Sequence, residues 1–120
     1  MATIQPTIPG DLEPGTWGVL WSGVSTGDTI HPAKVPFAWM NLGSVQIAGT
    51  FGGATVTLQV SNDGTNYATL DDVSGVDVSA ASALIAEVSN SALYWKPSIT
   101  GGSSDSVTIK IVGRGGTGRV

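Results

Sequence analysis

Apolar and polar residues alternate without a break in the middle of this chain, over residues 54–60. One face carries Ala54, Val56, Leu58 and Val60, and the other carries Thr55, Thr57 and Gln59. A period of two with many β-branched residues indicates a half-buried antiparallel strand. Because Leu58 lies in the middle of the apolar face, we expect its side chain to be fully buried. Asn62-Asp63-Gly64 follows, and these residue types tolerate positive φ, which predicts a chain reversal into residues 67–70.

Shorter patterns of the same kind predict further strands at residues 17–21, 44–50, 92–100 and 107–111. Residues 26–36 read as a loop, and residues 71–77 and 101–105 read as turns. Pro97 cannot donate a backbone hydrogen bond, so it indicates a sheet edge or a bulge within its strand. Residues 79–88 remain open between two interpretations, since their alanines permit a short helix and a strand is equally defensible.

Short strands separated by turn signals predict an all-β fold, a single antiparallel β-sandwich over residues 16–113. Jelly-roll connectivity is our preferred topology. Residues 114–120 form a glycine-rich tail. Residues 1–15 contain Pro6, Pro9 and Pro14, which rule out a regular helix and predict an extended N-terminal arm.

The arm carries three spaced large apolar residues, Ile4, Ile8 and Leu12. An extended segment of this kind suits a groove or a sheet edge on a partner protein. We therefore expect these three side chains to contact a partner, and the arm to be weakly held in the free protein. The alternative is an arm that folds back on its own sandwich.

A chain of 120 residues is long enough to form one domain with its own core. It contains no cysteine, which excludes disulfides and thiolate metal sites. Only 12% of the residues are charged, which suits a protein packed against neighbours, although small all-β domains often share this composition. Residues 1–95 hold eight acids and one base (−7), and residues 96–120 hold four bases and one acid (+3), which together give −4. Such polarity could orient the domain on a charged surface.

The same numbers narrow the classes of partner. Four dispersed bases are too few for nucleic-acid binding as a main function. No apolar run has the length of a membrane span, and no signal-peptide pattern is present, so we expect a soluble protein made in the cytoplasm.

No constellation in the sequence points to catalysis. His31, the one histidine, precedes Pro32, and no Gly-x-Ser-x-Gly motif accompanies it. The acidic group Asp63, Asp71, Asp72 and Asp77 lacks the alternating spacing of a calcium loop, and capping of their own turns explains it more simply. The glycines of residues 113–118 lack the Gly-Lys-Ser/Thr ending of a phosphate loop. We expect no catalytic residue, metal or cofactor.

Four tryptophans are many for a chain of this length: Trp17, Trp21, Trp39 and Trp95. At least two should fill the core of the sandwich. Trp39 beside Met40 is the best candidate for a partner interface, where tryptophan is enriched. A carbohydrate platform is a third interpretation.

Four segments together resemble a family of small proteins encoded among tailed-bacteriophage structural genes. They are Gly-Asp-Thr at residues 27–29, Gly-Thr-Phe-Gly-Gly-Ala at 49–54, Ser-Asn-Asp-Gly-Thr-Asn-Tyr at 61–67 and Thr-Gly-Gly at 100–102. The similarity extends over residues 27–113. It departs at Tyr67, where the family more often has Trp, and at Lys96-Pro97, where Arg-Pro is commoner.

The resemblance implies a non-enzymatic virion protein that decorates or cements the outer surface of the capsid by bridging subunits of the major capsid protein. Decoration proteins commonly act as trimers, so a homotrimer is expected. The alternative is a tail, fibre or receptor-binding component with glycan affinity. A hydrolytic enzyme, the third class, is disfavoured by the inventory above.

Overall fold

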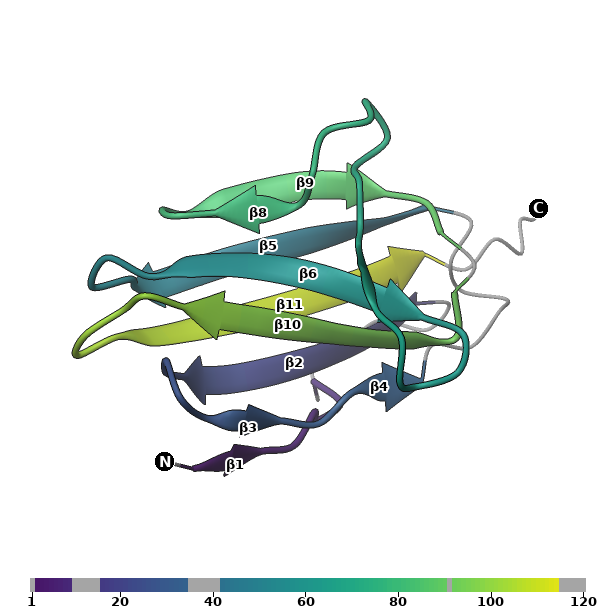
Figure 1. The fold of residues 1–120 in the computed structure, drawn as a ribbon. Helices are drawn as coiled ribbons and strands as arrows, with labels where there is room; N and C mark the ends of the chain where they lie inside the picture. The colour runs from purple at the N-terminus through teal and green to yellow at the C-terminus, as the bar shows by residue number, and fades with distance from the viewer. Residues whose placement is uncertain (1, 10–15, 35–41, 91, 115–120) are drawn as a thin grey trace.

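The computed structural model describes residues 2–9, 16–34, 42–90 and 92–114, and this part of the chain is all-β (Figure 1). Its strands are β1 (Thr3–Ile4), β2 (Thr16–Val24), β3 (Thr29–Ile30), β4 (Ala33–Lys34), β5 (Leu42–Thr50), β6 (Thr55–Ser61), β7 (Ala68–Thr69), β8 (Ser79–Ala80), β9 (Leu84–Val88), β10 (Tyr94–Thr100) and β11 (Ser106–Arg114). None of the described residues forms a helix able to cross a membrane.

Two antiparallel sheets pack face to face as a β-sandwich, which confirms the predicted fold class. One sheet has the order β2-β11-β5-β9, and the other has the order β4-β10-β6-β7, with β8 also paired to β6. The pairs β2 with β11, β4 with β10, β5 with β9 and β6 with β7 and β8 are nested in the sequence. They describe one long hairpin folded over on itself, which is the preferred jelly-roll connectivity.

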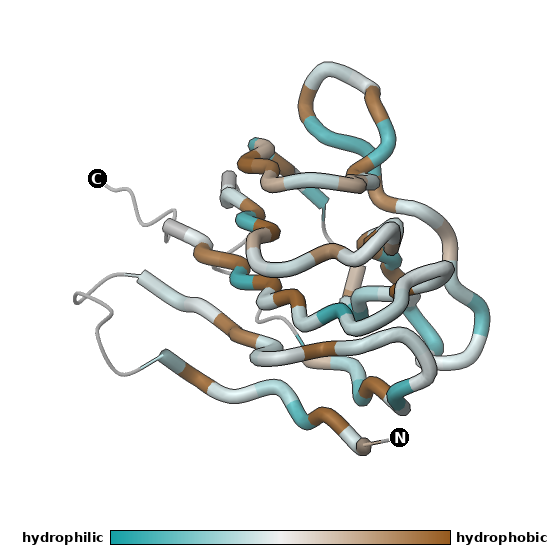
Figure 2. The backbone as a smooth tube through the Cα atoms, turned by 90° about the vertical axis from the view of Figure 1, so that its left-hand side faces the viewer, coloured by the Kyte–Doolittle hydropathy of each residue, from teal (hydrophilic) through white to brown (hydrophobic). Residues whose placement is uncertain are grey.

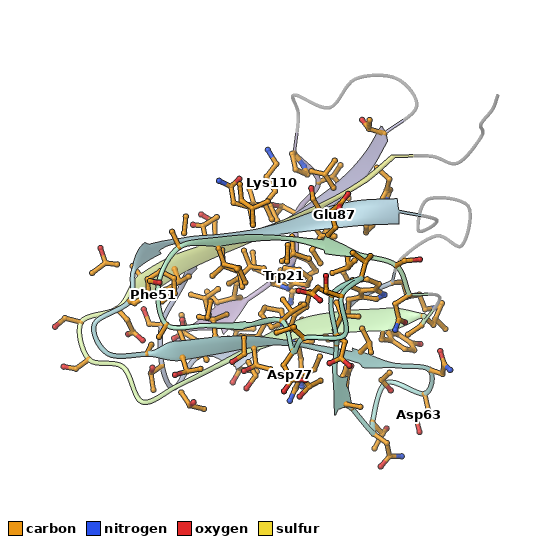
Figure 3. All side chains as sticks on the ribbon, turned by 90° about the horizontal axis from the view of Figure 1, so that it is seen from above. Trp21, Phe51, Asp63, Asp77, Glu87 and Lys110 are labelled. Carbon is orange, nitrogen blue, oxygen red and sulfur yellow. The ribbon has the colours of Figure 1, made fainter. Side chains whose placement is uncertain are left out.

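The core lies between the two sheets, where alternate residues of every long strand point inward. Trp21 comes from the first sheet and Trp95 from the second, and both are fully buried. Figure 3 shows Trp21 between the two sheets. The two indole Nε1–H groups donate to the carbonyls of His31 and Ala92, each at 2.9 Å. The prediction that at least two tryptophans fill the core is therefore confirmed. Leu58 is also fully buried, as its place in the alternation indicated.

Residues 79–88 adopt the strand alternative as β8 and β9. In β9, Leu84, Ala86 and Val88 turn toward the core, whereas Ile85 and Glu87 are exposed, so the period is two. Pairing with β5 determines this outcome, because a strand here completes the first sheet. The predicted loop at 26–36 differs in detail, since β3 and β4 make short pairings within it.

Residues 2–9, the described part of the N-terminal arm, are extended and held by the chain's own sandwich, which is the alternative to the expectation of a weakly held arm. β1 pairs in parallel with β3, and Thr7 exchanges two backbone hydrogen bonds of 2.9 and 2.8 Å with Leu20 of β2. The Ala2 N–H also donates to the Asp28 carboxylate at 3.0 Å. The physical reason is that β2 and β3 present free backbone groups, and the arm supplies partners for them.

The turn after β6 is organised by one carboxylate. Asp63 accepts hydrogen bonds of 2.8 Å from the backbone N–H groups of Thr65 and Asn66, from the Asn66 amide and from the Ser61 hydroxyl. These donors, the Asn66 N–H above all, lower the pKa of Asp63 well below its usual range. This acid therefore caps its own turn, as the sequence suggested.

Replacing Leu58 by alanine should lower the free energy of unfolding by about 2–5 kcal/mol, through lost burial and the cavity left between the sheets. Denaturant unfolding measures this, with Thr55→Ala on the exposed face of the same strand as the control. An unchanged midpoint for the Leu58 variant would contradict the assigned strand face.

The arm supplies a matched pair of isoleucines. Ile4 is half-buried and packs against the core, whereas Ile8 is 64% exposed. We expect Ile4→Ala to lower the free energy of unfolding by about 1–2 kcal/mol and Ile8→Ala to change it by less than about 0.5 kcal/mol. Equal, negligible effects of the two substitutions on the melting temperature would show that the arm is not docked in solution.

Asp63→Ala should lower stability at neutral pH and do so less at low pH. A depressed carboxylate pKa stabilises the folded state above the unfolded value of about 3.9, and this stabilisation is lost as the pH falls below that value. The difference in melting temperature between the two proteins should be constant from about pH 7 to 5 and shrink from about pH 4 to 2. A difference that does not vary with pH argues against a capping carboxylate.

Candidate interaction surface

Three of the segments that resemble phage proteins, residues 27–29, 49–54 and 100–102, lie at one end of the sandwich, where hydrogen bonds in and beside them join the loops. The Asp105 carboxylate accepts hydrogen bonds from the Thr26 N–H at 3.0 Å and the Thr26 hydroxyl at 2.6 Å, and Thr26 lowers its pKa. The Thr26 hydroxyl in turn accepts from Gly102 N–H at 2.9 Å. Gly52 has a φ of +56°, and a Cβ there would meet the Ser103 carbonyl at 2.1 Å, so only glycine fits. These hydrogen bonds and the glycine hold the loops at this end of the sandwich together, so we assign them a structural role.

Three of the five exposed large apolar side chains in the described part of the chain lie on β9 and on the loop between β7 and β8. Val73 is 54% exposed, Val76 is 60% exposed and Ile85 is 69% exposed. Figure 2 shows the loop projecting from the sandwich with hydrophobic segments on it. We call these three residues, together with Asp71, Asp72, Asp77 and Glu87, the β9 edge surface.

Hydrogen bonds within the loop fix its shape and leave Val73 and Val76 facing outward. The Asp72 carboxylate accepts from the N–H groups of Ser74 and Val76 at 2.9 and 3.0 Å, and the Asp72 N–H donates to the Val76 carbonyl at 2.7 Å. Gly75 supplies the positive φ, +83°, that closes the turn. Since the turn satisfies its own backbone, Val73 and Val76 are held at the surface, whereas Val78, at the end of the loop, is buried in the core.

Among the described residues, β9 is the outermost strand of its sheet, and only part of its outer edge is hydrogen-bonded. The Val73 N–H donates to the Glu87 carbonyl at 2.9 Å, so Glu87 turns its backbone away from β5. Ile85, two residues earlier, turns its backbone the same way. An unpaired strand edge beside exposed apolar side chains is a surface suited to pairing with another protein.

The rim of this surface is acidic. Asp71 and Asp77 face each other across an isolated bridge, and hydrogen bonding to the Asp77 side chain raises the pKa of Asp71. Glu87 is exposed on β9 itself. The combination of apolar centre, open backbone and negative rim favours a partner segment that is extended and carries basic groups.

The five residues predicted at an interface are distributed differently from this surface. Ile8 is exposed, and Ile4 packs against its own core. Leu12, Trp39 and Met40 lie outside the described residues. The β9 edge surface itself was missed, although two valines inside a predicted turn were a readable signal for it.

Within the described ranges, no group of three or more His, Asp or Glu side chains is placed to hold a metal ion. His31 is exposed between β3 and β4, where its backbone N–H donates to the Ile4 carbonyl at 3.0 Å. The His31 backbone carbonyl accepts the hydrogen bond of the Trp21 indole, so this residue has a structural role.

No protein-family model and no curated protein sequence matches this chain. Among solved structures, the fold is similar to the SPBc2 prophage-derived protein YomS, with a TM-score of 0.52, 8% identity, and coverage of 85% of this chain and 96% of that one. A protein of Bacillus endospore appendages aligns with a TM-score of 0.36 and 15% identity, over 93% of this chain and 92% of that one. A carbohydrate-binding module of Cellvibrio mixtus lichenase 5A aligns with a TM-score of 0.32 and 16% identity, over 95% of this chain and 87% of that one. The first likeness extends to the fold alone, and the other two are too weak to carry an argument.

Proposed function

We propose that this chain is a non-enzymatic structural protein of a bacteriophage virion, a decoration or cement protein that binds the outside of the capsid. The observation that carries the proposal is the β9 edge surface, where Val73, Val76 and Ile85 are more than half exposed beside an open strand. A domain with a complete core of its own has no structural need for this surface.

Two further observations support a phage origin. The motif segments at residues 27–29, 49–54, 61–67 and 100–102 resemble a family of tailed-phage virion proteins. The sandwich is also similar in fold to a prophage-derived protein, almost all of whose length aligns with this chain. A compact sandwich with no catalytic constellation among its described residues suits a stapling role.

The proposed partner is the major capsid protein, on the outer surface of the head. An extended segment of a capsid subunit would lie along β9, with apolar side chains on Val73, Val76 and Ile85 and basic groups against the acidic rim. Copies would act as homotrimers at three-fold positions, so that each trimer bridges neighbouring shell subunits. Many weak contacts of this kind resist the outward pressure of packaged DNA.

The first measurement is the copy number of this chain in purified particles. A number comparable to that of the major capsid protein supports decoration. A few to a few dozen copies would contradict it and favour a tail, fibre or receptor-binding component instead. Cross-linking of intact particles should also yield trimers of this chain.

A surface substitution then tests the docking face. Ile85→Asp should leave the melting temperature within a few degrees of the original, since the side chain is 69% exposed, and should reduce occupancy on capsids at least tenfold. Thr69→Asp adds the same charge at an exposed position of the other sheet and is the control. Full occupancy with the Ile85 variant would show that another face docks.

A further inference from the structure

A separate feature of the fold is a gap in the second sheet, on the side of β10 away from β6. β10 pairs with β6 over its whole length, from Tyr94 to Thr100, but with β4 only at Tyr94 and Trp95. Beyond Trp95 that side of β10 has no hydrogen-bonded strand among the described residues. β3 lies beside this stretch without pairing to it.

The direction of the backbone groups in this gap follows from their neighbours. The Leu58 N–H donates to the Val78 carbonyl at 3.0 Å, and the Leu58 carbonyl accepts from the Leu70 N–H at 2.9 Å. Both backbone groups of Leu58 therefore point away from Pro97, its partner in β10. Pro97 and, two residues later, Ile99 therefore turn their backbone groups into the gap. Proline has no N–H, so only its carbonyl is left there, which fits the predicted edge position.

The opposite wall of the gap comes from β3. The N–H groups of Thr29 and His31 both donate to the arm, at 2.8 and 3.0 Å. Ile30, between them, turns its backbone the other way, toward β10. Donors and acceptors of Ile30, Pro97 and Ile99 thus converge on one space.

That space is a pocket of about 150 Å³, room for about five water molecules and comparable to a single sugar ring. Four polar side chains complete its lining: Asp28, Gln59, Lys96 and Ser98. Gln59 and Ser98 are half-buried, and their side chains make no hydrogen bond with the described part of the chain. Donors and acceptors are therefore available without rearrangement.

The two charges of the pocket are held in place and balance each other. Lys96 Nζ lies 4.4 Å from the centre of the Tyr67 ring, a cation–π contact that positions it. The Asp28 carboxylate accepts from the N–H groups of Ala2 and Ser25, and these bonds lower its pKa, so it stays ionised. An anion would face Asp28 and a cation would face Lys96, which leaves a neutral ligand as the favoured class.

We propose that this pocket binds a neutral polyhydroxylated ligand, a single sugar ring of a glycan. Hydroxyl groups both donate and accept, so several of them at ring spacing match the mixed backbone groups of Ile30, Pro97 and Ile99 together with Gln59 and Ser98. The site does not depend on the virion role proposed above, and it shares no residue with the β9 edge surface.

The test is a titration of the full ¹⁵N-labelled chain with D-glucose, D-galactose and N-acetyl-D-glucosamine, followed by amide chemical shifts. One-ring contacts should bind with Kd values of about 1–50 mM. At least one sugar should shift the amides of Ile30, Lys96, Ser98 and Ile99, and inorganic phosphate should not.

Gln59→Ala should raise the Kd of the sugar, measured from the amide shifts, about tenfold, which is the loss expected for one ligand hydrogen bond. Gln46→Ala, an exposed glutamine on the outer face of the first sheet, should leave the Kd unchanged and is the matched control. The unliganded spectrum of each variant reports whether it is folded. Absence of shifts with all three sugars, a response to phosphate alone, or sugar shifts insensitive to Gln59→Ala would each overturn the proposal.

Discussion

Free strand edges are the constraint around which this molecule is organised. A sandwich of two open sheets exposes backbone donors and acceptors at every outer strand, and these groups must be paired, covered or charged. The arm covers β2 through Thr7 and pairs with β3 through β1. The loop bearing Val73 covers part of β9, and proline removes the one donor that β10 would leave open at residue 97. Both candidate sites lie where the described residues leave a strand edge partly uncovered.

The sequence predicted what depends on local alternation and missed what depends on pairing across the fold. The strand at residues 54–60 and the burial of Leu58 follow from a period of two that needs no tertiary information. Residues 79–88 stayed open because their alanines satisfy helix and strand equally, and only pairing with β5 decides between them. Ile85 could not be placed at the surface until that register was known.

The docking of the arm lay beyond the sequence for a related reason. Thr7 is held mainly through its backbone N–H and carbonyl, which every residue except proline could supply, so no side-chain pattern marks it. Ile4 and Ile8 look alike in the sequence, yet one packs against the core and the other is exposed. The pocket beside β10 is similar, since Pro97 signalled an edge, but the convergence of Ile30 on it depends on β3, which sequence reasoning placed in a loop.

The acidic rim of the β9 edge surface also bears on symmetry. If two copies paired β9 against β9 about a two-fold axis, Glu87 and the Asp71–Asp77 pair of each would lie near the same charges of the other, and like charges in close pairing are destabilising. The negative rim therefore disfavours an isologous dimer through this edge. A heterologous contact with a basic surface has no such cost, and heterologous contacts are the kind that close into a three-fold ring. The bases of this chain lie mostly in residues 96–120, opposite in sign to this rim, so a head-to-tail trimer and a basic capsid segment are both compatible with its charge.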